Sequence, residues 1–172
     1  NGRKLDESST NARQRVASAC QELIQFFYPN LKMLGDVKYQ EQNIAACLDD
    51  NCREMFPETL SEAQMEVLNL IKLNHGNGLR TTVKALRDKL NMRPYGWYDA
   101  AILCQVARLA ARGKLEVRSD GNLLDGQKLI AALRNSHGHD NVTLEPLADY
   151  TPAQIKRIKD FYTDYFQEPA NA

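Results

Sequence analysis

Two pairs of side chains have the residue types that metal binding or catalysis needs. His137 and His139 are separated by one glycine and could begin a zinc site, because imidazole nitrogens are zinc ligands. No cysteine and no second histidine pair lies near them in the sequence, so we expect an ordinary loop. Asp49 and Asp50 could act in acid–base chemistry. No histidine or nucleophile motif accompanies them, which favours a solvated pair, so we expect no catalytic residue, no metal and no other cofactor.

The sequence also lacks the short motifs that hold phosphates or activate nucleophiles. It contains no GxxxxGK(S/T) loop, so it cannot supply a P-loop of its own. It contains no GxSxG and no HExxH motif either. We therefore expect that this chain is not an enzyme.

A basic stretch in the middle of the chain could bind nucleic acid. The whole chain is neutral, with 22 basic and 22 acidic residues, but Lys72 to Arg118 carries ten basic and three acidic residues, a net +7. Basic charge around a helix-turn-helix pattern favours phosphate binding. Solvated helix faces would explain the same charge, and the sequence does not separate the two. The candidate nucleic-acid residues are Arg80, Lys84, Arg87, Arg93, Tyr95, Arg118 and Asn122.

Several of these candidates have a packing alternative. Arg93 forms an aromatic-basic cluster with Tyr95, Trp97 and Tyr98, which could stack bases or hold phosphates at the start of the third helix. Aromatic residues beside a Pro-Gly turn more often pack helices together, and we favour packing for Trp97 while Arg93 and Tyr95 stay open. Arg118 and Asn122 lie at a predicted hairpin and could contact a phosphate, although a solvated turn explains them equally well.

These side chains need a scaffold, and residues 59–124 have the order of a winged helix. The predicted helices begin at a Thr59 or Ser61 capping box, at a Thr81 or Thr82 cap, and at Trp97. The third helix ends before Gly113, and a β-hairpin with an Asp-Gly turn follows. The expected fold is mainly α, with a winged-helix-like core of three helices and a hairpin and with flanking helices.

The third predicted helix is unusual for a DNA reader. In a DNA-reading winged helix this element lies in the major groove and offers polar side chains to base edges. Residues 97–112 are dominated by Ala, Ile, Leu and Val instead. Ile102, Val106 and Leu109 recur at spacings of 4 and 3, which predicts core positions. A protein-assembly module therefore competes with a DNA-binding module.

The flanking segments are predicted to be helical. Residues 1–58 form an N-terminal helical segment whose first helix starts near Asn11 and carries one apolar stripe. Residues 125–172 form a helix-strand-helix extension that we expect to pack on the core. The last helix has an aromatic face, which either packs on its own domain or binds a partner. The candidate partner-binding residues are Phe161, Tyr162, Tyr165 and Phe166.

The cysteines and the absence of targeting signals predict a compartment. The four cysteines show no paired CxxC spacing, and Cys20 and Cys104 lie in apolar helical patterns. We expect buried thiols in a reducing compartment. The chain has no signal peptide and no apolar run long enough to cross a bilayer, so we expect a cytoplasmic protein without a membrane partner.

Three stretches together resemble a known family. They are Tyr28-Pro29-Asn30-Leu31, then Pro94-Tyr95-Gly96-Trp97 with the apolar helix and Gly113-Lys114-Leu115-Glu116, and finally Thr151-Pro152-Ala153-Gln154 with the aromatic helix. The chain resembles the C-terminal region of the large P-loop ATPase of bacterial BREX phage-defence systems, the BrxC/PglY type. The resemblance implies a bacterial cytoplasmic protein whose ATPase part lies upstream. None of that family's phosphate-binding residues has a counterpart here.

Two function hypotheses follow from the residues and the resemblance. The first is a non-catalytic assembly or interaction module of an anti-phage defence ATPase, with other subunits of a defence complex as partners. The second is a winged-helix module that binds double-stranded DNA mainly through phosphate contacts.

Overall fold

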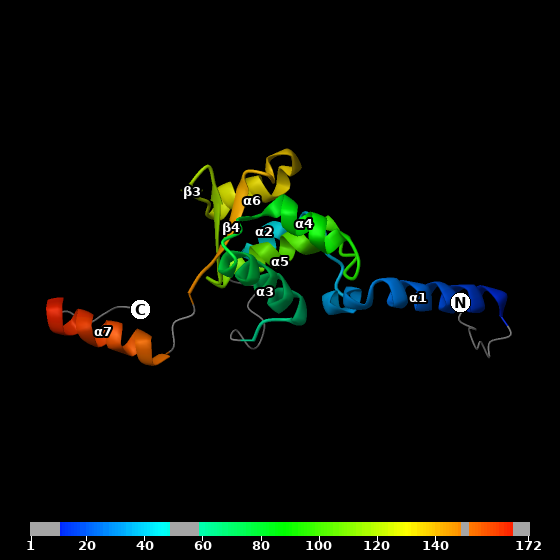
Figure 1. The fold of residues 1–172 in the computed structure, drawn as a ribbon, viewed down its shortest axis with the longest axis horizontal. Helices are drawn as coiled ribbons and strands as arrows, with labels where there is room; N and C mark the ends of the chain where they lie inside the picture. The colour runs from blue at the N-terminus through cyan, green and yellow to red at the C-terminus, as the bar shows by residue number, and fades with distance from the viewer. Residues whose placement is uncertain (1–10, 49–58, 149–151, 167–172) are drawn as a thin grey trace.

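Helices dominate the fold, and a small antiparallel sheet lies beside them (Figure 1). The computed structural model describes residues 11–48, 59–148 and 152–166. In chain order its elements are α1 (Ala12–Phe27), the 3-10 helix η1 (Pro29–Leu34), α2 (Asn43–Leu48), α3 (Glu62–Gly76), β1 (Thr81–Thr82), α4 (Val83–Asn91), α5 (Asp99–Ala111), β2 (Leu115–Ser119), β3 (Asn122–Leu123), α6 (Gly126–Arg134), the 3-10 helix η3 (Ser136–Gly138), β4 (Val142–Pro146) and α7 (Pro152–Phe166). The order from α3 to β3 is that of a winged helix, so the predicted mainly α fold is confirmed.

Capping side chains select where the helices begin. Of the two predicted capping registers, α3 uses the later one: Gln64 N–H donates to Ser61 Oγ at 3.3 Å, and Ser61 N–H donates to Gln64 Oε1 at 3.0 Å. The cap of α4 is Thr82, whose hydroxyl accepts from Ala85 N–H at 3.1 Å. Thr81 belongs to β1 instead. Asp49 and Asp50 lie outside the described residues.

The four strands form one antiparallel sheet in the order β1-β4-β2-β3. β4 is a central strand, because Leu144 pairs with Thr81 on one side and with Val117 on the other. The hairpin of β2 and β3 is the predicted wing, and its turn residues Asp120 and Gly121 both have positive φ values of 49° and 82°. The sheet therefore includes a strand that lies beyond the predicted 59–124 segment.

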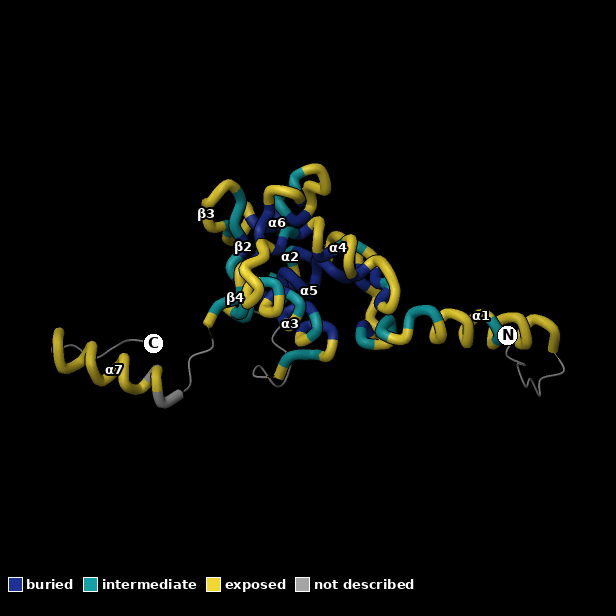
Figure 2. Tube along the Cα trace, in the orientation of Figure 1, coloured by how far each residue is buried: buried dark blue, intermediate teal, exposed yellow. Residues whose placement is uncertain are grey.

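Helix α5 occupies the centre of the core (Figure 2). Ile102, Val106 and Leu109 are fully buried, which confirms the prediction from their spacing. α2 packs across α5 and adds Ile44 and Cys47 to the same core. Helix α2 of the N-terminal segment is therefore part of the winged-helix body, because it covers a face of α5.

The two outermost helices differ from the core elements. All of α1 is described, and none of its residues is buried. Cys20 on α1 is exposed, so the expectation of a buried thiol is wrong there. Cys104 on α5 is buried, as expected. The extension was expected to pack on the core. Leu133 of α6 and Val142 of β4 are core residues, but the described side chains of α7 are exposed. No described element covers the apolar face of α7.

Among the residues that the structure describes, no helix combines the length and the hydropathy that crossing a bilayer requires.

Candidate nucleic-acid and partner interfaces

The helix that would read DNA has no polar side chain available for base edges. Gln105 is fully buried in α5. The guanidinium of Arg108 lies over the ring of Tyr39, 5.6 Å from its centroid. Asp99, at the start of α5, binds Arg87. Since direct readout needs exposed donors and acceptors on this helix, α5 in this arrangement cannot read a base sequence.

A polar cluster ties α4 to α5 and to the loop before β4. Arg87 donates to His139 Nδ1 at 2.9 Å and forms an ion pair with Asp99, whose other oxygen accepts from Asn91 at 3.1 Å. His139 Nε2 lies 2.8 Å from the carbonyl oxygen of Leu133. A guanidinium can only donate, so Nδ1 is the acceptor and Nε2 carries the proton that Leu133 accepts. Both ring nitrogens are thus occupied, and His139 is buried while His137 is exposed.

The electrostatics of this cluster are those of a structural ion pair. The hydrogen bond from Arg87 lowers the pKa of Asp99, and the same bond raises the pKa of Arg87. Burial lowers the pKa of His139, so the imidazole is held neutral. Beside the cluster, Lys84 Nζ lies 2.9 Å from Asp140 Oδ2, which raises the lysine pKa. Two of the candidate DNA-binding cations are therefore already paired with carboxylates.

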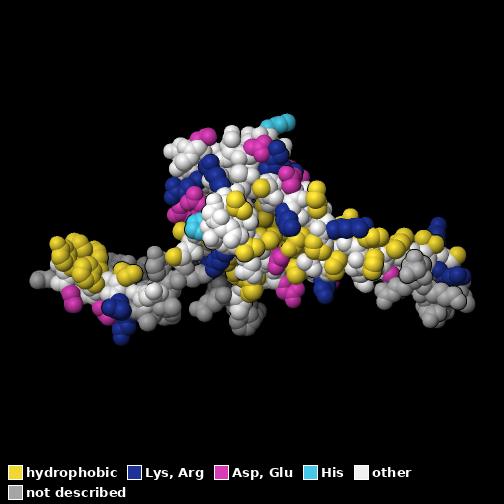
Figure 3. All heavy atoms as spheres, in the orientation of Figure 1, with side chains coloured by type: hydrophobic (Ala, Val, Ile, Leu, Met, Phe, Trp, Pro, Cys, Tyr) yellow, Lys and Arg dark blue, Asp and Glu magenta, His cyan; other side chains and the backbone are white. Residues whose placement is uncertain are grey.

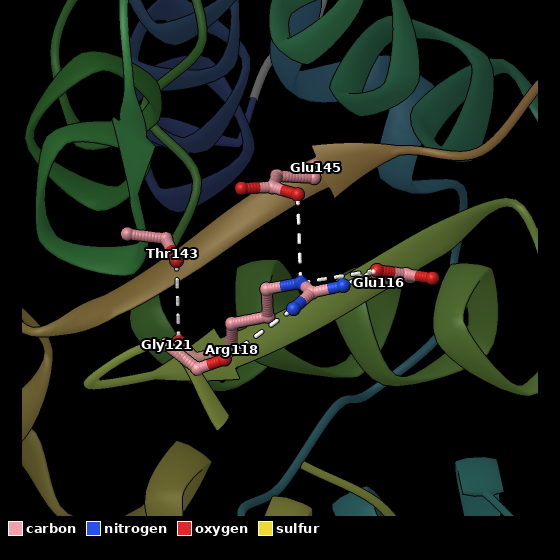
Figure 4. Close-up of polar contacts among 5 residues, drawn as sticks. All are labelled: Glu116, Arg118, Gly121, Thr143 and Glu145. Carbon is pink, nitrogen blue, oxygen red and sulfur yellow. Dashed lines mark hydrogen bonds and ion pairs between the residues drawn. The ribbon is translucent and has the colours of Figure 1, made fainter. Parts of the chain in front are cut away.

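The basic residue of the wing is also paired (Figure 4). Arg118 Nη2 lies 2.6 Å from Glu116 Oε2, and its Nε lies 3.5 Å from Glu145 Oε2 on the neighbouring strand β4. Its Nη1 also donates to the carbonyl of Gly121 at 3.3 Å. The bond to Glu116 raises the pKa of Arg118. Asn122 is exposed at the start of β3, next to a wing whose arginine faces two acidic side chains.

Arg93 and Tyr95, which the sequence left open, take part in packing. The Arg93 guanidinium lies over the ring of Phe27, 3.8 Å from its centroid. Tyr95 is buried, its hydroxyl binds the carboxylate of Glu66, and burial together with this bond raises its pKa to about 12. Trp97 is buried as well, so the packing interpretation of this residue is confirmed.

The candidate nucleic-acid residues do not form one patch of unpaired cations. Lys84, Arg87 and Arg118 have acidic partners, and Arg93 lies against Phe27. Arg80 is exposed between α3 and β1. On the face shown in Figure 3, basic side chains are interspersed with acidic ones instead of being gathered. No group of three or more His, Cys, Asp or Glu side chains in the described ranges is arranged to hold a metal ion.

A junction between two distant segments was not predicted. Asn30 N–H donates to the carbonyl of Pro94 at 3.1 Å, and Trp97 Nε1 donates to the carbonyl of Asn30 at 3.0 Å. Gly96, with φ +63°, lies so close to Tyr28 that a Cβ at this position would be 2.5 Å from Tyr28 Cδ1. Both segments stood out in the sequence, but no local pattern indicated that they touch.

Comparison with known families assigns the body of the molecule. A model of the winged helix-turn-helix domain of the BREX ATP-binding protein BrxC matches residues 30–146, well over half of the chain. The chain belongs to this family. The expected resemblance to the BREX ATPase of the BrxC type is thereby confirmed. No solved structure matches the chain. The BrxC match includes α2, the four strands and α6, whereas α1 and α7 lie outside it.

Both helices outside the BrxC match carry large exposed apolar side chains. On α7, Phe161 is 67% exposed and Tyr165 is 71% exposed, and their rings stack at 5.9 Å between centroids. Tyr162 and Phe166 form a second ring pair, 4.6 Å apart. The four predicted partner-binding residues therefore lie together on one exposed helix of this BrxC-type domain.

Proposed function

We propose that this domain is a non-catalytic assembly module of a cytoplasmic anti-phage defence ATPase, and that it binds other subunits of the defence complex. The observation that supports this proposal is the contrast between helices α5 and α7. The helix that reads DNA in other winged helices is buried here, while α7 exposes four aromatic side chains. Aromatic residues are enriched among the side chains that dominate binding energy, so α7 is the proposed binding element.

The energetics of α7 support a role in binding. Its 15 residues leave five large apolar side chains exposed, from Ile158 to Phe166. Helices of this length are marginal in water unless an apolar face packs on something. Covering one such side chain is worth roughly 1.5–3 kcal/mol. A partner that covers this face would therefore stabilise the helix and gain affinity at the same time.

The proposal assigns no catalysis to this domain. The sequence contains no phosphate-binding loop. The buried apolar side chains of the described chain form one packed core, and the polar cluster around Arg87 has its partners within the fold. ATP binding, which the family's name includes, is assigned by the proposal to other parts of the parent protein.

The proposal is tested in the parent protein, co-expressed with the other subunits of its own BREX system. The double variant Phe161→Asp/Tyr165→Asp should lose co-purification of at least one of those subunits and lose protection against phage. The control is Thr163→Asp, which places one negative charge on an exposed position of α7 away from the aromatic side chains. Equal co-purification of both variants would contradict the proposal, as would purification of the wild-type protein without any of these subunits.

Duplex DNA binding is the second candidate. The winged-helix family and the exposed Arg80 favour it. The ion pairs of Lys84, Arg87 and Arg118 weigh against it, because each side chain must leave its carboxylate before it neutralises a phosphate.

A further inference from the structure

The charged side chains of α7 follow an order along the helix. Lys156, Arg157 and Lys159 come first, and Asp160 and Asp164 follow them. All five side chains are exposed. A lone helix favours the reverse order, because its N-terminus carries a partial positive charge and its C-terminus a partial negative charge. The charges of α7 therefore do not stabilise the helix by itself, but they match a second helix that has the same charge order and runs in the opposite direction.

Three exposed apolar side chains of α7 form a seam along the helix. Ile158, Phe161 and Tyr165 are 58%, 67% and 71% exposed, and they recur at the spacings of 3 and 4 that coiled-coil contacts use. Figure 3 shows hydrophobic side chains gathered along α7. Arg157 and Asp164 directly precede the first and the last residue of the seam, so both border it on the same side.

The two charges that border the seam are unpaired within the described chain. Neither Arg157 nor Asp164 has an ion-pair partner among the described residues, whereas Lys84, Arg87 and Arg118 of the body each bind a carboxylate. In paired helices, charges beside the apolar seam determine which helix is accepted and in which orientation. The charges of α7 can therefore identify its partner.

We propose that α7 pairs in antiparallel orientation with α7 of a second copy of this chain. The inference rests on the proposed function, since it uses the same helix, and it deepens that function by naming one partner. In a two-fold pair, if residue i contacts residue j, then j also contacts i. With Ile158 of each copy against Phe161 of the other, Arg157 lies opposite Asp164 of the other copy, twice. A parallel pair would instead place each charge against its own copy.

The remaining charges of α7 stay out of this contact. At about 100° per residue, Lys156, Lys159 and Asp160 lie more than about 120° from the middle of the seam. Lys156 and Asp160 are four positions apart, where opposite charges on one helix attract. The antiparallel pair therefore brings opposite charges together at its border and leaves the other charges of the helix in solvent.

The attachment of α7 to the body also fits the antiparallel orientation. β4 ends at Pro146 and α7 begins at Pro152, so the body of each copy lies at the N-terminal end of its own helix. α7 lies apart from the body in Figure 1, so the body does not cover the seam. Antiparallel pairing then holds the two bodies at opposite ends of the helix pair, where they do not collide.

The size of the contact predicts a weak dimer. α7 has 15 residues, and at 1.5 Å per residue it is roughly 22 Å long. Two such helices bury less than the roughly 800 Å² per partner of a standard interface. We therefore expect a dissociation constant on the order of 10 µM, in the range of transient association.

Sedimentation equilibrium of the complete chain, without other subunits, tests the pairing with reversed charges. Arg157→Glu and Asp164→Arg should each weaken the monomer–dimer equilibrium by roughly tenfold, because each turns two attractive contacts into repulsive ones. The double variant Arg157→Glu/Asp164→Arg should restore the wild-type equilibrium, since opposite charges meet again. Both positions are exposed, so all three variants should keep the wild-type melting temperature of the body.

The same series tests the orientation. In a parallel pair each charge faces its own copy, so the single variants and the double variant would all dimerise like wild type. That result would overturn the antiparallel pairing. A double variant as weak as the single variants would also overturn it, as would a chain that stays monomeric at every concentration or a dimer that persists in Phe161→Asp/Tyr165→Asp.

Failure of the pairing is seen separately from failure of the proposed function. The pairing is measured on the chain alone, whereas subunit binding is measured by co-purification with the parent protein. A monomeric chain whose parent protein still co-purifies other subunits through α7 would overturn only the pairing. A chain that dimerises with the expected charge dependence, in a parent protein that retains no other subunit, would overturn only subunit binding.

Discussion

The indole Nε1 of Trp97 donates a 3.0 Å hydrogen bond to the carbonyl oxygen of Asn30, a residue 67 positions earlier in the chain. The bond joins the foot of α1 to the turn that leads into α5. Asn30 N–H returns a bond of 3.1 Å to Pro94 in the same turn. The outer helix α1 and the buried helix α5 are thereby connected through one compact junction.

Gly96→Ala should disrupt this junction. The new Cβ would lie 2.5 Å from the ring of Tyr28, and φ at this position is +63°. Gly113→Ala is the matched control, because its φ is also +63° but nothing lies within 4 Å of its Cβ. The control should lose about 1–2 kcal/mol from backbone strain alone, and Gly96→Ala should lose about 1–3 kcal/mol more from overpacking. Urea unfolding measures both, and equal losses would contradict the close contact.

Ile102→Ala should destabilise the fold strongly. Ile102 is fully buried in α5, so truncation leaves a cavity and should cost about 2–5 kcal/mol. Ile158→Ala removes the same atoms from a side chain that is 58% exposed on α7, and its cost should stay within about 0.5 kcal/mol. Similar melting temperatures for the two variants would mean that α5 is not the centre of the core.

Gln105→Met should leave stability unchanged or raise it. The amide of Gln105 is fully buried, and neither its oxygen nor its nitrogen has a hydrogen-bond partner among the protein atoms. Removing polar atoms that bind nothing relieves a desolvation cost. Gln64→Met is the control, since Gln64 Oε1 accepts from Ser61 N–H and from Arg112. The control should lose about 1–3 kcal/mol in chemical denaturation; a comparable loss for Gln105→Met would refute the expectation.

Stability should fall as the pH drops below the ordinary range of histidine. The folded protein holds the pKa of His139 below its usual value because the ring is buried. The unfolded chain therefore binds the proton more readily, so the contribution of His139 is complete above about pH 6.5 and declines below it. The charge of Arg87 also lowers this pKa, whereas the charges of Asp99 and Asp140 raise it.

The pH prediction is checked by urea unfolding at about pH 7.5 and about pH 5.5, on either side of the ordinary histidine pKa. His139→Gln should lower the stability at the higher pH and reduce its loss on acidification. His137→Gln, at an exposed position, should keep the wild-type pH dependence. If His139→Gln loses as much stability as wild type between the two pH values, the prediction is wrong.

Duplex DNA should bind weakly and without sequence preference. α5 offers no side chain to base edges, and Arg118 is paired with Glu116 and Glu145. In fluorescence anisotropy we expect dissociation constants no tighter than the 10⁻⁴–10⁻⁶ M that is roughly typical of non-specific binding. Glu116→Gln/Glu145→Gln should tighten binding at low salt, because it releases Arg118. Tight, sequence-selective binding would contradict the buried position of α5.

Local patterns in the sequence determined the winged-helix elements. Helix starts and the hairpin depend on neighbouring residues, such as Ser61 with Gln64 or Asp120 with Gly121, and these bonds form within a few residues. The 4 and 3 spacing of Ile102, Val106 and Leu109 indicated burial because one helix face is a local property. Phe161 and its aromatic neighbours were recognised as an apolar face for the same reason.

The tertiary structure alone decided what those faces contact. Three contacts join segments that are far apart in the chain. α2 packs on α5, β4 pairs between β1 and β2, and Trp97 donates a hydrogen bond to Asn30. The sequence could not show whether the cations of the basic stretch are free to bind phosphates, because Arg118 meets Glu145 only when β2 and β4 pair. Periodicity shows that a face is apolar or charged, but the free energy that selects its partner comes from packing between distant segments. For that reason the exposed stripes of α1 and α7 were visible in the sequence, and only the fold showed that the body of the domain leaves them uncovered.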